Sequence, residues 1–323
     1  MNVFVTGGAG YIGSVCVEEL LNSGHQVTVF DNLCEGHRSA IDPRAKFIQG
    51  DFNDRESIFV ALRAIEPEAV IHFAAHALVG ESMVNPSKYF RNNVSGGLNL
   101  LDACVATGIK KFVFSSTCAT YGMPDRVPIT EDLPQRPINP YGESKLMFEK
   151  ILTWYRQLHG LEPVAFRYFN AAGASERFGE HHRVETHLIP NVLKVALGQK
   201  AQVEVFGSDY PTPDGTCIRD YVHIADLAQA HIAALQPGIS GFYNLGNGEG
   251  FSVNEVIATC ETVTGRKIAT AYKDRRPGDP ARLLAGAAKV SEDLHWVPRY
   301  PKLAQIIQTA WAWHLKHPTG YAD

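Results

Sequence analysis

The sequence lacks the features that mark secreted and membrane-spanning proteins. Its six cysteines lie far apart and none forms a C-x-x-C pair, which predicts reduced thiols and a cytoplasmic protein. The longest apolar stretch, near residues 69–80, is interrupted by His72 and His76 and falls short of the roughly 20 residues of a membrane span. The N-terminus has no basic segment before an apolar one, so we expect neither a signal peptide nor a membrane partner.

Basic charge is not in excess either. The chain has 30 Lys and Arg residues against 34 Asp and Glu residues, for a formal net charge of −4, and the two signs are interspersed along the sequence. We therefore expect no nucleic-acid partner. The net charge does not show where individual arginines lie. A few arginines in one place can still bind an anionic substrate.

Metal-binding motifs are also missing. His181, His182 and His187 fall in one polar stretch, but the chain has no H-E-x-x-H and no compact set of cysteines and histidines. Motifs of those kinds are the usual signs of a metal site. We therefore expect the 13 histidines to be solvated or buried in the core, and we expect no metal.

What the first half of the sequence does show is an alternation of strand and helix patterns. Hydrophobic residues make up 45% of the 323 residues, an ordinary globular value. A helix is expected from about residue 12 to 22. Short apolar segments predict strands over residues 3–6, 26–30, 47–50, 69–73, 111–115 and 163–168. This alternation predicts an α/β fold with a Rossmann-type, doubly wound parallel sheet covered by helices on both faces.

The pattern changes after Tyr168. Long polar loops rich in glycine or proline are expected over residues 171–186, 207–216 and 274–280. We predict a dinucleotide-binding domain over residues 1–170 and a smaller, substrate-binding α/β domain over residues 171–323. An apolar segment near residues 242–246 is expected to return to the first sheet, so the boundary need not be a single cut.

A glycine-rich turn follows the first predicted strand. Gly7, Gly10 and Gly13 are spaced G-x-x-G-x-x-G and lead directly into the first predicted helix. Glycine lets the backbone approach a pyrophosphate closely, and the helix N-terminus offers free N–H groups to that anion. Asp31 ends the second predicted strand, where a carboxylate bonds the adenosine ribose hydroxyls. Because this carboxylate would repel the extra phosphate of NADP, we predict NAD.

A pair of residues with base chemistry follows the fifth predicted strand. Tyr141 and Lys145 are four residues apart after Pro140, which suits a helix start, so they share one helix face. An ammonium beside a phenol favours the phenolate and lowers the phenol pKa from about 10, and a nicotinamide cation would act in the same sense. We expect Tyr141 to take a proton from a substrate hydroxyl, with Thr117 donating to the same oxygen.

These residues carry a family resemblance. The glycine turn and Tyr141-x-x-x-Lys145 with its upstream threonine resemble the extended short-chain dehydrogenase/reductases. Across nearly the whole chain the sequence is similar to the UDP-galactose (UDP-glucose) 4-epimerases of that family. The matching segments are residues 6–13, 31–33, 72–75, 79–82, 92–94, 167–170, 206–207, 214–216, 219–223 and 243–246. The resemblance implies reversible epimerisation of the sugar at C4 through a 4-keto sugar, with NAD held tightly throughout, in a homodimer.

The resemblance also implies roles for individual residues. Tyr141, Lys145 and Thr117 are the expected catalytic residues. The expected cofactor-binding residues are Gly7, Gly10, Tyr11, Ile12, Gly13, Asp31, Asn32, Asp51, Phe52, Phe73, Ala74, Ala75, Asn92, Ser115, Tyr141, Lys145 and Tyr168. The expected UDP-sugar-binding residues are Thr117, Tyr141, Phe169, Asn170, Leu188, Phe206, Arg219, Tyr221, Arg276 and Asp279.

Other functions stay open at this point. The substrate can be another UDP-sugar, such as an N-acetylhexosamine, a pentose or a uronate, because Leu283 is intermediate in size where the resemblance places a residue beside the sugar C2 substituent. A nucleotide-sugar dehydratase or decarboxylase is a second alternative. A dehydratase needs an acid and a base after the catalytic threonine, however, and this chain has Cys118 and Ala119 there. A regulator that binds NAD without turnover is a third.

Overall fold

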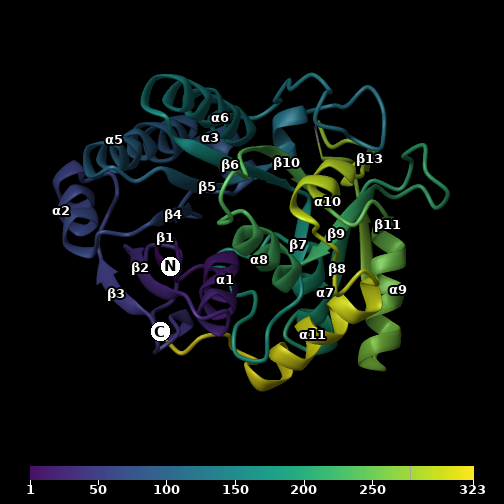
Figure 1. The fold of residues 1–323 in the computed structure, drawn as a ribbon. Helices are drawn as coiled ribbons and strands as arrows, with labels where there is room; N and C mark the ends of the chain where they lie inside the picture. Colours follow the sequence, from purple (N-terminus) through teal and green to yellow (C-terminus); the bar gives the residue numbers. More distant parts are fainter. Residues whose placement is uncertain (277) are drawn as a thin grey trace.

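The computed structural model describes residues 1–276 and 278–323 of the chain (Figure 1). Within these residues the largest sheet has seven strands in the order β3-β2-β1-β4-β5-β6-β10, and every neighbouring pair is parallel. The strands are β1 (Asn2–Thr6), β2 (Gln26–Asp31), β3 (Lys46–Gln49), β4 (Ala69–His72), β5 (Lys111–Thr117), β6 (Glu162–Tyr168) and β10 (Gly241–Leu245). The predicted Rossmann-type, doubly wound sheet is therefore confirmed.

Helices cover both faces of this sheet. Side chains alternate along each strand, so Val3 and Val5 pack on one face while Phe4 packs on the other. The face of Val3 is covered by α1 (Tyr11–Asn22), α8 (Ile224–Ala233) and α10 (Ala288–Leu294). The face of Phe4 is covered by α2 (Arg55–Ile65), α5 (Gly97–Thr107) and α6 (Pro140–His159). The short helices α3 (Val79–Val84) and α4 (Pro86–Tyr89) and a π-helical segment, Phe90–Gly96, lead into α5.

A second group of elements forms its own core (Figure 1). Its strands are β7 (Asn170–Ala172), β8 (Val203–Phe206), β9 (Ile218–His223), β11 (Gly250–Ser252), β12 (Thr270–Lys273) and β13 (Arg282–Leu283). Strand β9 pairs with β7, β11 and β13, while β8 pairs with β12. The helices α7 (Leu188–Ala196), α9 (Val253–Thr264) and α11 (Leu303–Lys316) pack on one another around this core.

The segment expected to return to the first sheet does so. Strand β10 pairs in parallel with β6, in a register that aligns Gly241 with Val164, and α8 packs against α1. The division at residue 170 stays a prediction, and both of these later elements lie with the first sheet. The predicted loop over residues 274–280 includes Pro277, which lies outside the described residues.

Two further observations bear on the sequence predictions. Among the described helices, none combines the length and the apolar character needed to cross a membrane. All six cysteines are free thiols.

A buried histidine makes the stability of the fold sensitive to acid. His231 of α8 is fully buried. Its Nδ1 lies 2.8 Å from the Leu227 carbonyl oxygen and its Nε2 lies 2.5 Å from the Tyr168 hydroxyl. A carbonyl can only accept, so Nδ1 carries the proton and Nε2 accepts from Tyr168. Burial lowers the pKa of His231 to about 4, which keeps the imidazole neutral.

We predict that a His231→Gln variant loses part of this acid sensitivity. The unfolded imidazole gains its proton near pH 6.5, whereas the native one resists protonation down to about pH 4. The unfolded state therefore binds more protons in this window, and the free energy of unfolding falls as the pH is lowered, by up to about 1.4 kcal/mol per pH unit. Urea unfolding at pH 7 and pH 5 measures the difference. The exposed His159, changed to Gln, is the control, and equal pH dependence of both variants would contradict the prediction.

Candidate active site

The predicted cofactor turn and the predicted catalytic residues open onto one cavity. This cavity has a volume of about 350 Å³ and is lined by Gly10, Thr117, Tyr141 and Lys145, among others. It lies at the carboxyl ends of β1, β4 and β5, where the strand order reverses direction. In open α/β sheets this is the place where nucleotide ligands bind.

In the glycine turn, Gly7 and Gly13 are in close contact with neighbouring backbone atoms, whereas Gly10 has space beside it. Gly7 has a φ of +76°, and a Cβ there would collide with the backbone of Ala74. A Cβ at Gly13 would collide with the Gly7 carbonyl oxygen. Gly10 differs, because a Cβ there would meet only the Gly7 carbonyl oxygen, at 3.4 Å. Gly10 therefore leaves room on its cavity side, and the first turn of α1 leaves N–H groups without helical partners there. This cradle fits a dinucleotide pyrophosphate.

Asp31, at the end of β2, fixes the position of the glycine turn through hydrogen bonds. Its Oδ2 accepts a hydrogen bond from the Ala9 N–H (3.0 Å) and its Oδ1 accepts one from the Leu33 N–H (2.8 Å). Burial raises the pKa of Asp31, and these two hydrogen bonds act in the opposite sense. Each oxygen keeps a further lone pair, so the carboxylate can position the turn and still accept from a ribose hydroxyl. Asp31 acts as a strand-end cap whether or not it meets the cofactor.

The residues predicted for the adenine end also meet. Asp51 accepts hydrogen bonds from Asn32 (3.1 Å) and from Asn53 (2.8 Å), and Asn53 donates to Asn92 (2.9 Å). Phe52 differs from the others, since its ring is buried in the core and contacts the His72 ring edge-on. Any contact of Phe52 with adenine therefore falls to its backbone.

The residues predicted to be catalytic come from β5 and the start of α6. Asn139 caps α6 by accepting from the Gly142 N–H (2.8 Å), which sets Tyr141 in the first turn. The Lys145 Nζ donates to the Ser115 carbonyl oxygen (2.7 Å) and lies 4.8 Å from the centre of the Phe114 ring. Tyr141, Thr117 and Ser115 all line the cavity with Lys145. The structure therefore brings these four residues to one cavity.

The electrostatics of this group differ from the sequence expectation. Burial raises the pKa of Tyr141 to about 12, which the Thr117 hydroxyl opposes. Burial also lowers the pKa of Lys145 to about 7, which the Glu149 carboxylate opposes. Lys145 is not among the groups that shift the pKa of Tyr141, so the expected lowering of the phenol pKa by the ammonium stays a prediction. Burial is the largest cause of both shifts, because each charged form loses its water.

A second cluster gathers four residues predicted to bind the substrate. Arg219 of β9 is buried and forms an ion pair with Asp279. The Arg276 guanidinium lies over the Phe206 ring, 4.0 Å from its centre. Arg219 and Tyr221 are two residues apart on β9, so they project from the same face of the strand, and Tyr221 lines the cavity. The face of β9 thus leads from the cavity to this second cluster.

The cavity gathers most of the predicted residues. Those that line it are Gly7, Gly10, Tyr11, Ile12, Gly13, Phe73, Ala75, Ser115, Thr117, Tyr141, Lys145, Tyr168, Phe169, Asn170, Leu188 and Tyr221. The predicted residues that do not line it are Asp31, Asn32, Asp51, Phe52, Ala74, Asn92, Phe206, Arg219, Arg276 and Asp279. The roles of both sets in binding stay predictions.

In one group beside this cavity, the histidines were considered from the sequence but the two glutamates were not. Glu180, His182, Glu185 and His187 lie together, and all but Glu185 line the cavity. The signal was present in the spacing E-x-H-x-x-E-x-H over residues 180–187, which fits none of the common metal motifs.

Comparison with known proteins identifies the family. Residues 3–246 match the model of the NAD dependent epimerase/dehydratase family. The chain belongs to this family. A UDP-glucose 4-epimerase of Lacticaseibacillus casei is 49% identical over 329 aligned residues, which cover 100% of this chain and 99% of the relative.

Solved structures of the same family agree with the fold. UDP-glucose 4-epimerase from Brucella ovis, in complex with NAD, is 47% identical with a TM-score of 0.93 and covers 96% of this chain and 97% of its own. UDP-glucose 4-epimerase from Bifidobacterium longum, in complex with NAD+ and UDP, is 38% identical with a TM-score of 0.95 and covers 99% of this chain and 100% of its own.

We predict that alanine substitutions separate two roles of the glycine turn. Gly13→Ala drives its methyl group into the Gly7 carbonyl oxygen, so we expect a loss of stability of about 1–3 kcal/mol from overpacking. Gly10→Ala makes only an ordinary contact within the protein but fills the side that faces the cavity. We expect it to melt at nearly the wild-type temperature and to bind NAD at least about tenfold more weakly, a difference of 1.4 kcal/mol. Thermal melts and NAD titration measure both effects, and unchanged NAD affinity in Gly10→Ala would contradict this assignment.

Proposed function

We propose that the protein interconverts UDP-galactose and UDP-glucose by inverting the sugar at C4, with NAD bound throughout the cycle. The observation that carries the proposal is the single cavity shared by the glycine turn, Thr117, Tyr141 and Lys145. Family membership and relatives described as UDP-glucose 4-epimerases support it. Bound NAD supplies the hydride acceptor and donor that inversion at a carbon without acidic hydrogen requires.

Tyr141 is the residue proposed to move the proton of the sugar 4-hydroxyl. Its phenol lies in the first turn of α6 beside Thr117, which is positioned to hold the same substrate oxygen. Burial raises the pKa of Tyr141 to about 12 although the Thr117 hydroxyl opposes it, so the phenolate needs a positive charge next to it. The nicotinamide cation of bound NAD is the charge proposed to meet this need, and Lys145 adds to it when its amine is protonated.

The substrate anchor is proposed to hold the nucleotide and leave the sugar free to turn. Arg219 and Arg276 suit bidentate recognition of a diphosphate, and Asn170 lines the same cavity as the catalytic group. The Phe206 ring, over which the Arg276 guanidinium lies, is proposed to meet the uridine end. Binding energy concentrated on the diphosphate fixes the substrate without fixing the face that the sugar presents to Tyr141.

The side chains after Thr117 favour epimerisation over dehydration. Loss of the C6 hydroxyl needs an acid and a base near C5 and C6, and Ala119 has neither group. Burial raises the pKa of Cys118 to about 12, so its thiol stays neutral and is a poor acid. The proposal therefore takes simple inversion as the reaction.

We propose that the protein works as a cytoplasmic homodimer. The free thiols support a reducing compartment. On α6, Trp154 and Leu158 expose 62% and 70% of their surfaces, and exposed apolar groups of this size favour an interface. Sedimentation of wild type and of Trp154→Glu tests the assembly, with a dimer expected for wild type and a shift toward monomer for the variant. A wild-type monomer at micromolar concentration would contradict the homodimer.

The activity itself is tested without added cofactor. Purified protein is incubated with UDP-galactose, and the UDP-sugars are separated by chromatography. We expect UDP-glucose to form without added NAD, and Tyr141→Phe to retain NAD but to turn over about 10²–10⁴-fold more slowly, because it loses proton transfer.

Two controls separate the alternatives. Parallel incubation with UDP-N-acetylglucosamine tests a wider substrate range, and activity restored by added NAD means only that NAD was lost in purification. Bound NAD with no turnover of either UDP-sugar would contradict the proposal and favour a regulator that binds NAD.

A further inference from the structure

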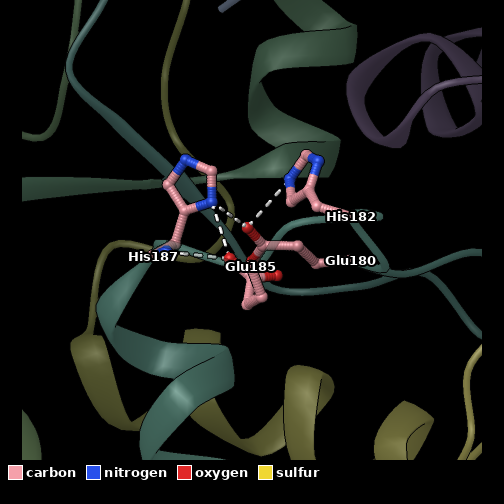
Figure 2. Close-up of side chains that lie close together, drawn as sticks. All are labelled: Glu180, His182, Glu185 and His187. Atoms are coloured by element: carbon pink, nitrogen blue, oxygen red, sulfur yellow. Dashed lines mark hydrogen bonds and ion pairs between the residues drawn. The ribbon is translucent and has the colours of Figure 1, made fainter. Parts of the chain in front are cut away.

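A cluster of two carboxylates and two imidazoles lies at the edge of the cavity (Figure 2). Glu180, His182 and Glu185 belong to the segment before α7, and His187 is the residue that precedes its first turn. Figure 2 shows the two imidazole rings on opposite sides of the Glu180 carboxylate, with Glu185 beside it. The His187 side chain makes no capping hydrogen bond to α7; its Nδ1 points to the carboxylates instead.

The four side chains converge, and within the group His187 and Glu185 also form a pair, because the Glu185 Oε1 accepts from the His187 backbone N–H (2.8 Å) and lies 2.9 Å from its Nδ1. One ligand atom from each of them lies within 4.8 Å of all the others. The Glu180 Oε1 is 3.0 Å from the His187 Nδ1 and 3.2 Å from the His182 Nε2. An ion bound tetrahedrally at about 2.0–2.1 Å sets its ligand atoms about 3.3–3.4 Å apart, so small movements would complete such a shell.

The contacts at Glu180 have the distances of ion pairs without the directions of hydrogen bonds. Its Oε1 is buried, and within the described residues no donor meets it with hydrogen-bond geometry, although two imidazole nitrogens are near. This holds for Glu180 only, because the His187 Nδ1 does form a hydrogen bond with the Glu185 Oε1 (2.9 Å). A hydrogen bond to the Glu180 Oε1 would have an N–H group aimed at this oxygen, whereas a metal ligand points to the ion.

Burial makes a positive charge at this point necessary. The Glu180 and Glu185 side chains are exposed by only 6% and 4%, and two buried carboxylates need two compensating charges. A divalent cation with neutral imidazoles supplies both at once. Two imidazolium ions would supply the same charge without a metal. Binding of a metal ion would release their protons and take the place of these two charges.

We propose that Glu180, His182, Glu185 and His187 form a binding site for a divalent transition-metal ion of the zinc type. Two imidazole nitrogens and two carboxylate oxygens suit Zn²⁺ and Co²⁺ and are a poor match for Mg²⁺, which prefers oxygen ligands and water. All four ligands lie within eight residues of sequence, so little chain entropy opposes closure. This proposal departs from the expectation of no metal, which was drawn from the missing H-E-x-x-H and Cys/His sets.

Such an ion would tie the segment before α7 to the start of that helix at the edge of the cavity. His182 contacts the Tyr11 ring edge-on, and Tyr11 begins α1 beside the glycine turn. The site is therefore built between the predicted cofactor turn and Leu188, the predicted substrate residue that begins α7. The proposal goes beyond the epimerase activity and is tested by bound metal alone.

The test measures metal bound to the full-length protein carrying no histidine tag. Wild type is dialysed against micromolar Zn²⁺ with excess Mg²⁺, and bound zinc is measured by mass spectrometry. We expect about one ion per chain in wild type and at least about tenfold weaker binding in His182→Ala and in Glu185→Gln, because each removes a ligand. His181→Ala is the matched control, since His181 stacks on His37 outside the cluster and its loss should leave zinc binding unchanged.

The Co²⁺ spectrum of wild type decides the matter even if a variant folds poorly. We expect the intense visible absorption of a tetrahedral ion. The weak spectrum of hydrated Co²⁺, no bound zinc in wild type, or equal zinc binding by wild type and a folded His182→Ala would each overturn the proposal. Circular dichroism of the metal-free variants shows whether they are folded.

Discussion

The close contact between the backbones of Gly7 and Ala74 is the constraint on which the site depends. The N–H groups of Phe73 and Ala74 both donate to the Thr6 carbonyl oxygen, at 2.9 and 3.2 Å, and this draws the segment after β4 against the turn after β1. Only glycine can occupy position 7 at that distance and with that φ. The turn in turn fixes where α1 begins, so the N–H groups proposed to face a pyrophosphate take their direction from this contact.

A buried ionic network gives the catalytic helix a similar fixed position. The Glu149 carboxylate of α6 accepts hydrogen bonds from Arg167 of β6 (2.7 Å) and Ser116 of β5 (2.5 Å), and Arg167 also donates to the Tyr121 hydroxyl (2.7 Å). Glu149 lies one turn of α6 beyond Lys145. The network therefore holds α6 in register with both strands, and a buried charge pair of this kind specifies one arrangement more than it adds stability.

Much of the fold was predictable because its pattern is local. Strand alternation, the glycine spacing and the four-residue step from Tyr141 to Lys145 all depend on neighbours in sequence, and the structure confirms the elements they predict. The direction of the pKa shifts was not predictable, because burial of Tyr141 and Lys145 depends on the whole cavity.

The positions of individual rings were not predictable either, because the burial of the Phe52 ring depends on residues distant in sequence that share its cluster. The cluster around Glu180 was visible only as a spacing without a known motif. The structure brings many of the predicted site residues together, but their roles stay predictions.

The return of β10 to the first sheet has a consequence for how the chain is made. Strand β6 ends at Tyr168, yet its outer neighbour begins at Gly241, so more than seventy residues, which include β7, α7, β8 and β9 of the second core, are synthesised between them. A ribosome that has released only the first six strands presents β6 as an open edge, which can pair with other chains. The seven-stranded sheet is complete only after β10, which ends at Leu245, has left the ribosome. The long sequence separation of β6 and β10 makes their pairing a late and slow step of folding.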